Sequence, residues 1–241
     1  MTNKLNVLVF MQELTIWITY HDERQIEEYG LHDDGVFRLF KGNDTSVEGE
    51  HINHLNAFYA EMTTMYWVWK NQRQSHYVGF CHYRRRFTHF LELDKGECQI
   101  LHAQRMPSVY RHYKDAHNYH DYDAIVTILN DKYGQGNPYS AYMLHDGLFV
   151  PFCCFIMHWE DFERLCEFLF PVLFEFDHRQ GLDMKPELYR RKAERDFPHD
   201  SADYQQRAVA FLAERLISCF IVTHMNAISV KSIKQRLGYY D

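Results

Sequence analysis

Residues 76–87 read HYVGFCHYRRRF, a short apolar run that passes directly into a cluster of basic side chains. Residues 77–81 are aromatic, β-branched or small, a composition typical of a buried strand. Hydrogen-bond donors and positive charge follow where this strand ends. Open α/β sheets bind ligands outside the carboxyl ends of their strands. The segment therefore predicts both a central strand and the position of a site.

The segments around it alternate between strand-like and helix-like patterns. Further strands are expected at residues 6–10, 15–20 and 147–157. Helices are expected at residues 58–71, 108–117, 121–134, 160–176 and 203–224, and loops at 41–54 and in the charged connection 177–200. Such alternation predicts an α/β fold in which a mixed sheet is flanked by helices. We expect residues 1–241 to form a single domain.

Composition narrows the class of protein. The chain has 241 residues, of which 46% are hydrophobic, enough for one domain with a substantial core. Its net charge of −7 would repel a nucleic-acid backbone, so no nucleic-acid partner is expected. The six cysteines include no Cys-x-x-Cys pair, which favours reduced thiols and a cytoplasmic location.

Known sequence motifs exclude several enzyme classes. The chain contains no Gly-x-Gly-x-x-Gly, Walker loop, Gly-x-Ser-x-Gly elbow or His-Glu-x-x-His. The apolar run at residues 208–222 is interrupted by Glu214 and Arg215 and is too short to span a bilayer. Peripheral contact with the inner face of the cytoplasmic membrane stays open.

The basic cluster is the strongest candidate for a binding site. Arginine forks match phosphate oxygens in pairs, so His82, Arg84 and Arg85 are expected to bind a diphosphate. His21, which follows the strand at residues 15–20, is expected to bind the diphosphate with them. Tyr83 is expected to contact or support the substrate. The alternative is a solvated basic turn, or partners for the excess of acidic residues.

The aromatic helix before the basic strand carries further candidates. Its polar members Glu61, Trp67, Lys70 and Asn71 are expected to contact or support a substrate. Glu61 either balances an arginine or touches the substrate, and the residues alone do not decide between these roles.

Two carboxylates are candidates for the catalytic base toward an acceptor hydroxyl. Asp146 precedes the strand expected at residues 147–157, where Gly147 permits a close approach of the backbone to a ligand. A plain turn is the more common explanation of such a pair. Glu214 lies inside an apolar helix next to Arg215, so an internal ion pair is its alternative. Arg207 and Arg215 are expected to support the site.

A His-rich stretch, HYKDAHNYHDYD at residues 112–123, suggests a metal site at first sight. His112 and His117 are five residues apart, however, and point to different sides of a helix. Asp121 is instead expected to cap a helix that begins at Tyr122, with Asp123 in its first turn. No metal ligands and no cofactor are expected.

Several motifs together resemble one family. Residues 61–71 (EMTTMYWVWKN) and 77–87 (YVGFCHYRRRF) are similar to the paired signature of a bacterial family catalogued as domain of unknown function 4422. Further matches are residues 155–162, 166–170 and 204–216, and the resemblance extends from about residue 15 to 224. It implies a fold similar to the GT-A class of nucleotide-sugar transferases. It also implies a glycosyltransferase of capsular or exopolysaccharide biosynthesis. Some members are linked to galactofuranose transfer, so galactofuranose is one expected sugar.

The resemblance also suggests a mechanism. In the GT-A class the equivalent strand normally ends in Asp-x-Asp, which holds a metal, whereas this chain has His-Tyr-Arg-Arg. We expect His82, Arg84 and Arg85 to replace that metal and stabilise the departing nucleotide. The family often has an aromatic residue directly after two arginines, whereas Arg86 intervenes here, so Arg84 and Arg85 are the expected pair.

The expected substrates are a UDP-sugar donor and a lipid-linked or oligosaccharide acceptor. The alternative from a different functional class is a non-catalytic glycan-binding or assembly subunit of the same pathway. Binding of UDP would separate the two.

Overall fold

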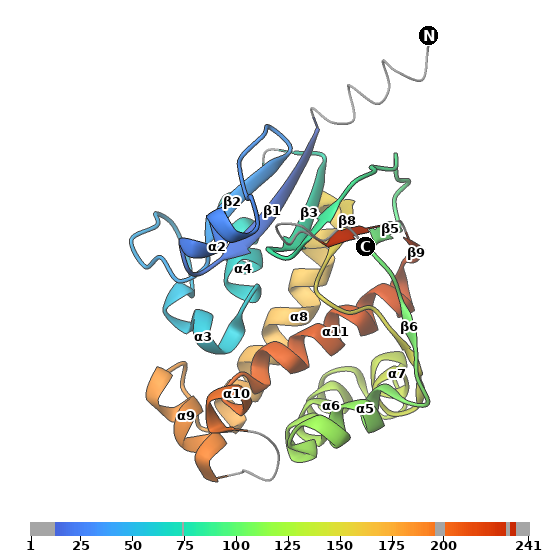
Figure 1. Ribbon diagram of the computed structural model, residues 1–241. Coiled ribbons are helices and arrows are strands. Elements are labelled where there is room, and N and C mark those ends of the chain that lie inside the picture. Colours follow the sequence, from blue (N-terminus) through green and yellow to red (C-terminus); the bar gives the residue numbers. More distant parts are fainter. Residues whose placement is uncertain (1–12, 74, 196–200, 230–231, 235–241) are drawn as a thin grey trace.

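The computed structural model describes residues 13–73, 75–195, 201–229 and 232–234. A six-stranded sheet with the order β2-β1-β3-β8-β5-β9 forms one layer, and most of the helices lie below it in Figure 1. Its strands are β1 (Leu14–Tyr20), β2 (Phe37–Lys41), β3 (Tyr77–His82), β5 (Glu97–Ile100), β8 (Phe155–His158) and β9 (Asn226–Ser229). The strands expected at 15–20 and 77–81 are confirmed, whereas β2 and β5 were not expected. The strand expected at residues 6–10 lies outside the described residues.

Strand direction defines one functional edge of this sheet. β1 runs parallel to β2 and β3, and β5 runs parallel to β9. β8 is antiparallel to both of its neighbours, β3 and β5. The carboxyl ends of the parallel strands therefore meet at one edge, where β8 begins. Thr19 pairs with His82 at this edge, so the ends of β1 and β3 lie side by side.

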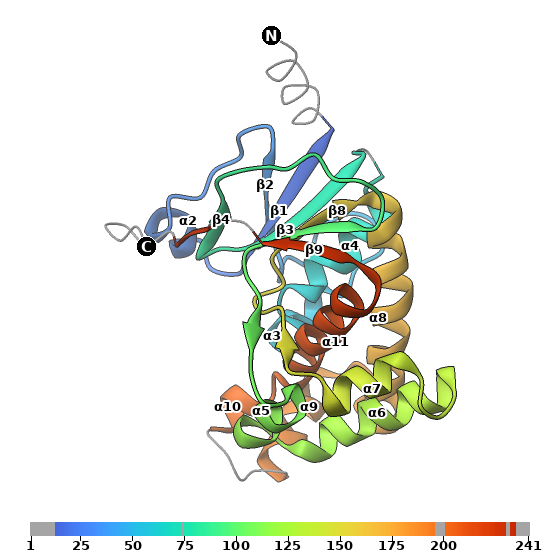
Figure 2. The same ribbon diagram turned by 90° about the vertical axis from the view of Figure 1, so that its right-hand side faces the viewer.

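The two faces of the sheet have different covers. Along β1, Leu14, Ile16 and Ile18 are buried on one face, while Trp17 and Thr19 face the other, as expected for a strand period of two. Figure 2 shows α2 (Arg24–Glu28) and β4 (Arg85–Phe87) on one side. On the other side lie α4 (Met62–Asn71), α8 (Trp159–Arg179) and α11 (Ala208–His224).

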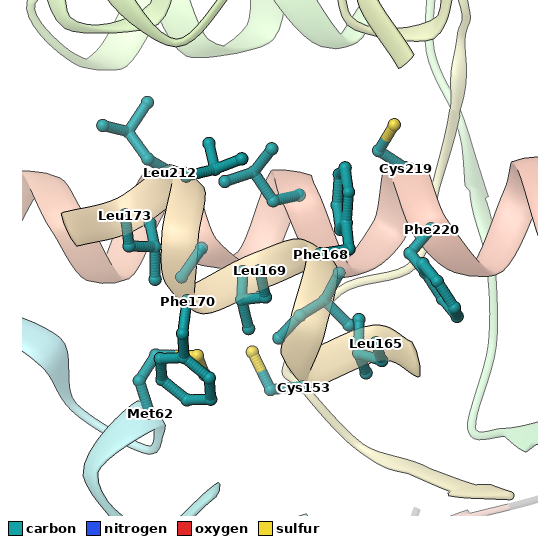
Figure 3. Close-up of a cluster of buried hydrophobic side chains, with 14 of the residues drawn as sticks. Met62, Cys153, Leu165, Phe168, Leu169, Phe170, Leu173, Leu212, Cys219 and Phe220 are labelled. Carbon is teal, nitrogen blue, oxygen red and sulfur yellow. The ribbon is translucent and has the colours of Figure 1, made fainter. Parts of the chain in front are cut away.

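The larger core lies between these helices and the sheet. Buried apolar side chains recur on α8 at helical spacing and meet those of α11. Figure 3 shows Leu165, Leu169 and Leu173 of α8 near Leu212 and Phe220 of α11. Full burial of each such side chain contributes about 1.5–3 kcal/mol. The helix layer is thus held to the sheet by a large buried apolar core.

Two expected helices are each interrupted in the structure. The helix expected at residues 58–71 is divided into α3 (Asn56–Tyr59) and α4, because Ala60 adopts φ 46° and ψ −127°. The helix expected at 203–224 is divided into α10 (Ala202–Gln205) and α11, with Gln206 and Arg207 between them. Both interruptions turn out to carry residues of the candidate site.

The segment expected as one strand at residues 147–157 is also divided. β7 (Leu148–Phe149) pairs with β6 (Gln104–Arg105), while β8 belongs to the main sheet. The turn between them contains Phe152 and Cys153 with φ of 77° and 51°. Left-handed backbone is costly for such residues, and strain of this kind clusters at functional sites.

The remaining helices support the helix layer. The expected helices at 108–117 and 121–134 correspond to α5 (Val109–Ala116) and α6 (Tyr119–Tyr133). The structure adds α7 (Pro138–His145), the turn η1 (Asn53–Leu55) and, inside the expected loop 177–200, α9 (Pro186–Arg195). β4 pairs with β10 (Ser232–Lys234).

All six cysteines are buried and unpaired. No helix of the described ranges combines the length and apolarity needed to cross a membrane.

The capping role expected for Asp121 is wrong. α6 begins at Tyr119 rather than Tyr122, and its cap is Asn118, whose side chain accepts the His120 N–H at 3.2 Å. Asp121 lies in the first turn, where its Oδ1 accepts a hydrogen bond of 2.6 Å from Lys192 Nζ. This buried ion pair joins α6 to α9.

Candidate active site

A cavity of about 300 Å³ lies at the carboxyl edge of β1 and β3. Small-molecule sites have volumes of roughly 300–1,000 Å³, so a ligand of modest size fits. Its lining comes from the ends of both strands, from the turn between α3 and α4, and from the start of α11. The lining residues are Thr19, His21, Asn56, Ala57, Ala60, Glu61, His82, Tyr83, Arg84 and Arg207.

The cavity brings together six residues that the sequence had suggested. They are His21, Glu61, His82, Tyr83, Arg84 and Arg207. Sequence reasoning missed Thr19, Asn56, Ala57 and Ala60. Thr19 could have been found from its place at the end of a strand, whereas the others depend on the break between α3 and α4.

Among the described residues, Arg84 and Arg207 have no acidic partner. No carboxylate of the described residues forms a salt bridge with either of them, in contrast to Arg86, which pairs with Asp34 and lies 3.9 Å from the centre of the Phe37 ring. The guanidinium of Arg84 lies 5.1 Å from the centre of the Tyr83 ring. Two positive charges are therefore available to an anion in the cavity.

His82 lies in the cavity wall with its side chain only 13% exposed. Burial lowers its pKa to about 3, and the positive charges of Arg84, Arg85 and Arg207 lower it further in the same direction. The imidazole is consequently uncharged at neutral pH. The expectation that His82 helps to replace a metal stays a prediction, and an uncharged His82 would contribute to it as a hydrogen-bonding group.

Tyr83 is held by aromatic contacts next to the arginines. Its ring stacks on His82 at a centroid distance of 4.2 Å. Tyr29 and His21 contact it edge-on at 5.1 and 6.1 Å. A ring fixed in this way offers a flat apolar surface with a polar end beside the cations.

A hydrogen-bonded turn presents Glu61 to the cavity. The Ala60 carbonyl accepts hydrogen bonds from Asn56 Nδ2 at 3.1 Å and Thr63 Oγ1 at 3.0 Å, and these two side chains also bond each other. A Cβ at Gly42 would lie 2.4 Å from Asn56 Nδ2, so a larger residue there would displace the side chain that holds this turn. Glu61 follows the strained Ala60, and its Oε1 lies 3.6 Å from His82 Nε2.

Arg85 points away from this cavity. Its guanidinium lies 3.5 Å from the centre of the Phe152 ring, and burial lowers its pKa. The Phe152 N–H donates to Glu214 Oε1 at 2.7 Å, so Glu214 holds the strained turn before β8. Arg85 therefore contacts the turn, and the structure does not bring it together with Arg84 in the cavity wall.

Neither Asp146 nor Glu214 lines the cavity. Asp146 ends α7, and its Oδ1 accepts the Leu148 N–H at 2.6 Å. Gly147 is close to the chain itself, since a Cβ there would lie 2.1 Å from the Met106 carbonyl oxygen. Glu214 accepts the Arg215 Nη1 at 2.8 Å in addition to the Phe152 N–H. A catalytic role for either carboxylate stays a prediction that none of these contacts supports.

The other supporting candidates make contacts within the protein. The Trp67 indole N–H donates to the Glu48 carbonyl at 2.8 Å. Asn71 Oδ1 accepts the Glu50 N–H at 3.0 Å, and Lys70 Nζ lies 3.8 Å from the centre of the Trp69 ring. Buried Arg215 donates to the Phe211 carbonyl at 3.0 Å and lies 3.2 Å from His112 Nδ1. These residues stabilise the surroundings of the site and do not line the cavity.

The His-rich stretch does not gather around one point. His112 contacts Arg215, whereas His117 stacks on Phe211 at 4.1 Å and contacts Gln205 at 3.3 Å. Within the described ranges, no three His, Cys, Asp or Glu side chains are arranged to hold a metal ion. Independence from metals stays a prediction.

Comparisons with known proteins agree with this architecture. A solved structure titled WbbM bifunctional glycosyltransferase, in its apo form, matches 91% of this chain with a TM-score of 0.64 and 20% sequence identity. The match spans 45% of that protein's chain, less than half of its length. At this identity the likeness shows the fold alone, and the expected α/β architecture similar to the GT-A class is confirmed.

No curated protein matches the chain. The family model described as domain of unknown function, DUF4422, matches residues 36–109 and 102–225, which together make up most of the sequence. The chain therefore belongs to the DUF4422 family.

Proposed function

We propose that the chain is a glycosyltransferase that moves a sugar from a nucleoside diphosphate donor to a hydroxyl of a glycan acceptor. One observation carries this proposal: Arg84 and Arg207 face a cavity at the carboxyl edge of the sheet without any carboxylate partner among the described residues. Their donors match the oxygens of a diphosphate. The fold shared with part of a bifunctional glycosyltransferase supports the same conclusion.

The two arginines would act on the leaving group. When the bond between the sugar and the diphosphate breaks, the electron pair stays on the phosphate oxygen. Fixed cations aimed at that oxygen stabilise the transition state more than the ground state. Hydrogen bonds to charged groups contribute about 1.5–3 kcal/mol each, so two arginines account for several orders of magnitude in rate.

The finer assignment follows the family resemblance. We propose UDP as the nucleotide, galactofuranose as the sugar, and a lipid-linked or oligosaccharide acceptor of capsular or exopolysaccharide biosynthesis. The reaction would take place at the inner face of the cytoplasmic membrane. The flat ring of Tyr83, held beside Arg84, offers a stacking surface for a base or a sugar.

Nucleotide binding is the first test. We expect UDP to raise the melting temperature and to give a measurable Kd by calorimetry, because a ligand that binds only the native state stabilises it by mass action. Release of UDP from UDP-galactofuranose, UDP-galactopyranose and UDP-glucose would then identify the donor. A purified chain that binds no UDP would refute the proposal. Binding of glycans without turnover of any donor would favour an assembly subunit.

Metal removal is the second test. Because arginines supply the positive charge, we expect turnover to be the same within about twofold after treatment with EDTA. UDP release is measured in the treated protein with and without added manganese. Strict dependence on manganese would contradict stabilisation by arginine alone.

A further inference from the structure

We propose that Glu61 is the general base that removes the proton from the attacking acceptor hydroxyl, and that His82 is the positioning residue for its carboxylate. This inference rests on the proposed transfer and adds the group that activates the acceptor. It replaces Asp146 and Glu214 as the expected base.

The first argument is the location of the carboxylate. Of the described residues that line the cavity, Glu61 is the one with an acidic side chain. Its side chain is 21% exposed, and no described donor forms a hydrogen bond with its oxygens. Asp146 and Glu214, in contrast, each accept a main-chain N–H bond. Glu61 therefore has free lone pairs beside the cations that would hold the donor.

The second argument is the state of the neighbouring imidazole. His82 Nδ1 accepts the Arg84 N–H at 3.1 Å, and burial together with the nearby arginines lowers the His82 pKa to about 3. An uncharged imidazole has one N–H. Because Nδ1 accepts the shorter contact, this N–H lies on Nε2, and the 3.5 Å approach of Arg84 Nη2 to Nε2 is then not a hydrogen bond. Nε2 lies 3.6 Å from Glu61 Oε1, and such catalytic hydrogen bonds are often long before a substrate binds. The imidazole thus directs one carboxylate oxygen and leaves the other for a hydroxyl.

The third argument is the strain of the supporting turn. Ala60 adopts a backbone conformation that costs about 1–3 kcal/mol for a residue other than glycine. Asn56 and Thr63 hold its carbonyl and so keep the turn in place. An unbroken helix through this segment would remove that turn, which presents Glu61 to the cavity. The strain is explained if the position of Glu61 is what the turn serves.

The charges around Glu61 are compatible with this role. The groups that share its cavity or interact with it electrostatically are His21, His82, Arg84, Arg207 and the thiol of Cys153. Burial raises the pKa of the Cys153 thiol, so that group carries no charge at neutral pH. The arginines supply positive charge near both the carboxylate and the diphosphate.

The step balances as a single displacement. The acceptor O–H bond breaks and its proton passes to Glu61, while the acceptor oxygen forms a bond to the anomeric carbon of the donor. The bond from that carbon to the diphosphate oxygen breaks, and its electron pair leaves on UDP next to Arg84 and Arg207. A single displacement inverts the anomeric configuration, and Glu61 later releases its proton to water.

Azide separates a base from a donor-binding residue, because this anion attacks without losing a proton. We expect Glu61→Gln to lower UDP release with water or a glycan hydroxyl as acceptor by about 10²–10⁴-fold. Release with azide, measured together with the glycosyl azide by mass spectrometry, should stay within about tenfold of the wild type, as should the Kd for UDP. Glu27→Gln, an exposed carboxylate on α2, is the matched control and should behave as the wild type.

The outcomes distinguish this inference from the proposed function. Normal hydroxyl transfer in Glu61→Gln would overturn the base, and so would equal loss of the azide and hydroxyl reactions. A wild-type chain that binds no UDP, or turns over no donor, would overturn the proposed function itself. His82 is tested by His82→Ala, which should lower the hydroxyl reaction about tenfold more than the azide reaction. His82→Gln, which keeps an N–H donor, should restore part of the loss, and failure of this rescue would contradict the positioning role.

Discussion

The buried Arg215 and the two cavity arginines, Arg84 and Arg207, differ in how their positive charge is balanced. Arg215 is buried within α11 and donates to Glu214 and to the Phe211 carbonyl. Arg84 and Arg207 line the cavity at the sheet edge and have no carboxylate partner in the described part of the chain. Burying a charge is costly unless it is paired, so the first arrangement offsets the cost of burying Arg215 within the fold. The guanidinium groups of Arg84 and Arg207 remain available to a ligand. Whether an arginine has a carboxylate partner therefore distinguishes structural arginines from binding-site arginines better than their charge does.

The largest effect should come from removing both unpaired cations. We expect Arg84→Ala/Arg207→Ala to lower kcat/KM for the donor by about 10³-fold or more, because two charge-assisted contacts to the leaving group are lost. The melting temperature should change little. Kinetics and thermal unfolding of the double variant are compared with Arg111→Ala, an exposed arginine on α5. Normal donor turnover in the double variant would remove the basis of the comparison.

The paired arginine should show the opposite behaviour. Arg215→Leu is expected to lower the free energy of unfolding by about 3 kcal/mol, because it leaves Glu214 without its buried partner. Urea titration measures this loss, and calorimetry below the unfolding transition should give an unchanged Kd for UDP. The added change Glu214→Gln should recover part of the stability. A specific loss of nucleotide binding with normal stability would place Arg215 in the site instead.

His82 provides a smaller effect that depends on pH. Its pKa in the folded state, about 3, lies below the ordinary value of 6.5, so the unfolded chain binds the proton first as pH falls. Its contribution to stability is therefore complete above pH 6.5 and is lost between pH 6.5 and 3, at up to about 1.4 kcal/mol per pH unit. His82→Gln should flatten the stability profile in this window, as urea titrations at several pH values would reveal. His54→Gln, at an exposed position, should leave the slope unchanged.

The smallest effect is expected at Arg86. Like Arg215 it has a carboxylate partner, but it is only partly buried. This arginine pairs with Asp34 and contacts the Phe37 ring at the partly exposed surface. We expect Arg86→Ala to cost about 1 kcal/mol of stability and to leave the Kd for UDP unchanged. Denaturant unfolding and calorimetry test both parts. A marked loss of UDP binding would extend the site beyond the cavity.

Local pattern was sufficient to predict the central strand and its basic end. Residues 77–81 have the composition of a strand, and polar residues follow them directly. Adjacent residues were therefore enough to predict both the strand and its functional end. The same reasoning treated Arg84 and Arg85 as a pair. Tyr83 and Arg84 form the turn after β3, whereas Arg85 begins β4 and contacts Phe152, so only Arg84 lines the cavity. The motif alone could not predict the direction in which each arginine side chain points.

The breaks that complete the site could not be predicted. Alanine is the most favourable helix former, so nothing at Ala60 signals the turn that presents Glu61. That turn is fixed by Asn56 and Thr63 and by the close approach of Gly42, contacts that exist only in the folded chain. Arg207 likewise reaches the cavity because α11 packs against α3. Tertiary contacts decided these positions.

The origin of the two cavity arginines gives the ligand a mechanical role. Arg84 follows β3, whereas Arg207 directly precedes α11, so they belong to different layers of the molecule. A diphosphate held by both would act as a cross-link between the sheet edge and the helix layer. When nucleotide is bound, amide hydrogens at the start of α11 should then exchange with solvent more slowly. The reason is that this end of the helix could unfold only after the phosphate had dissociated from Arg84.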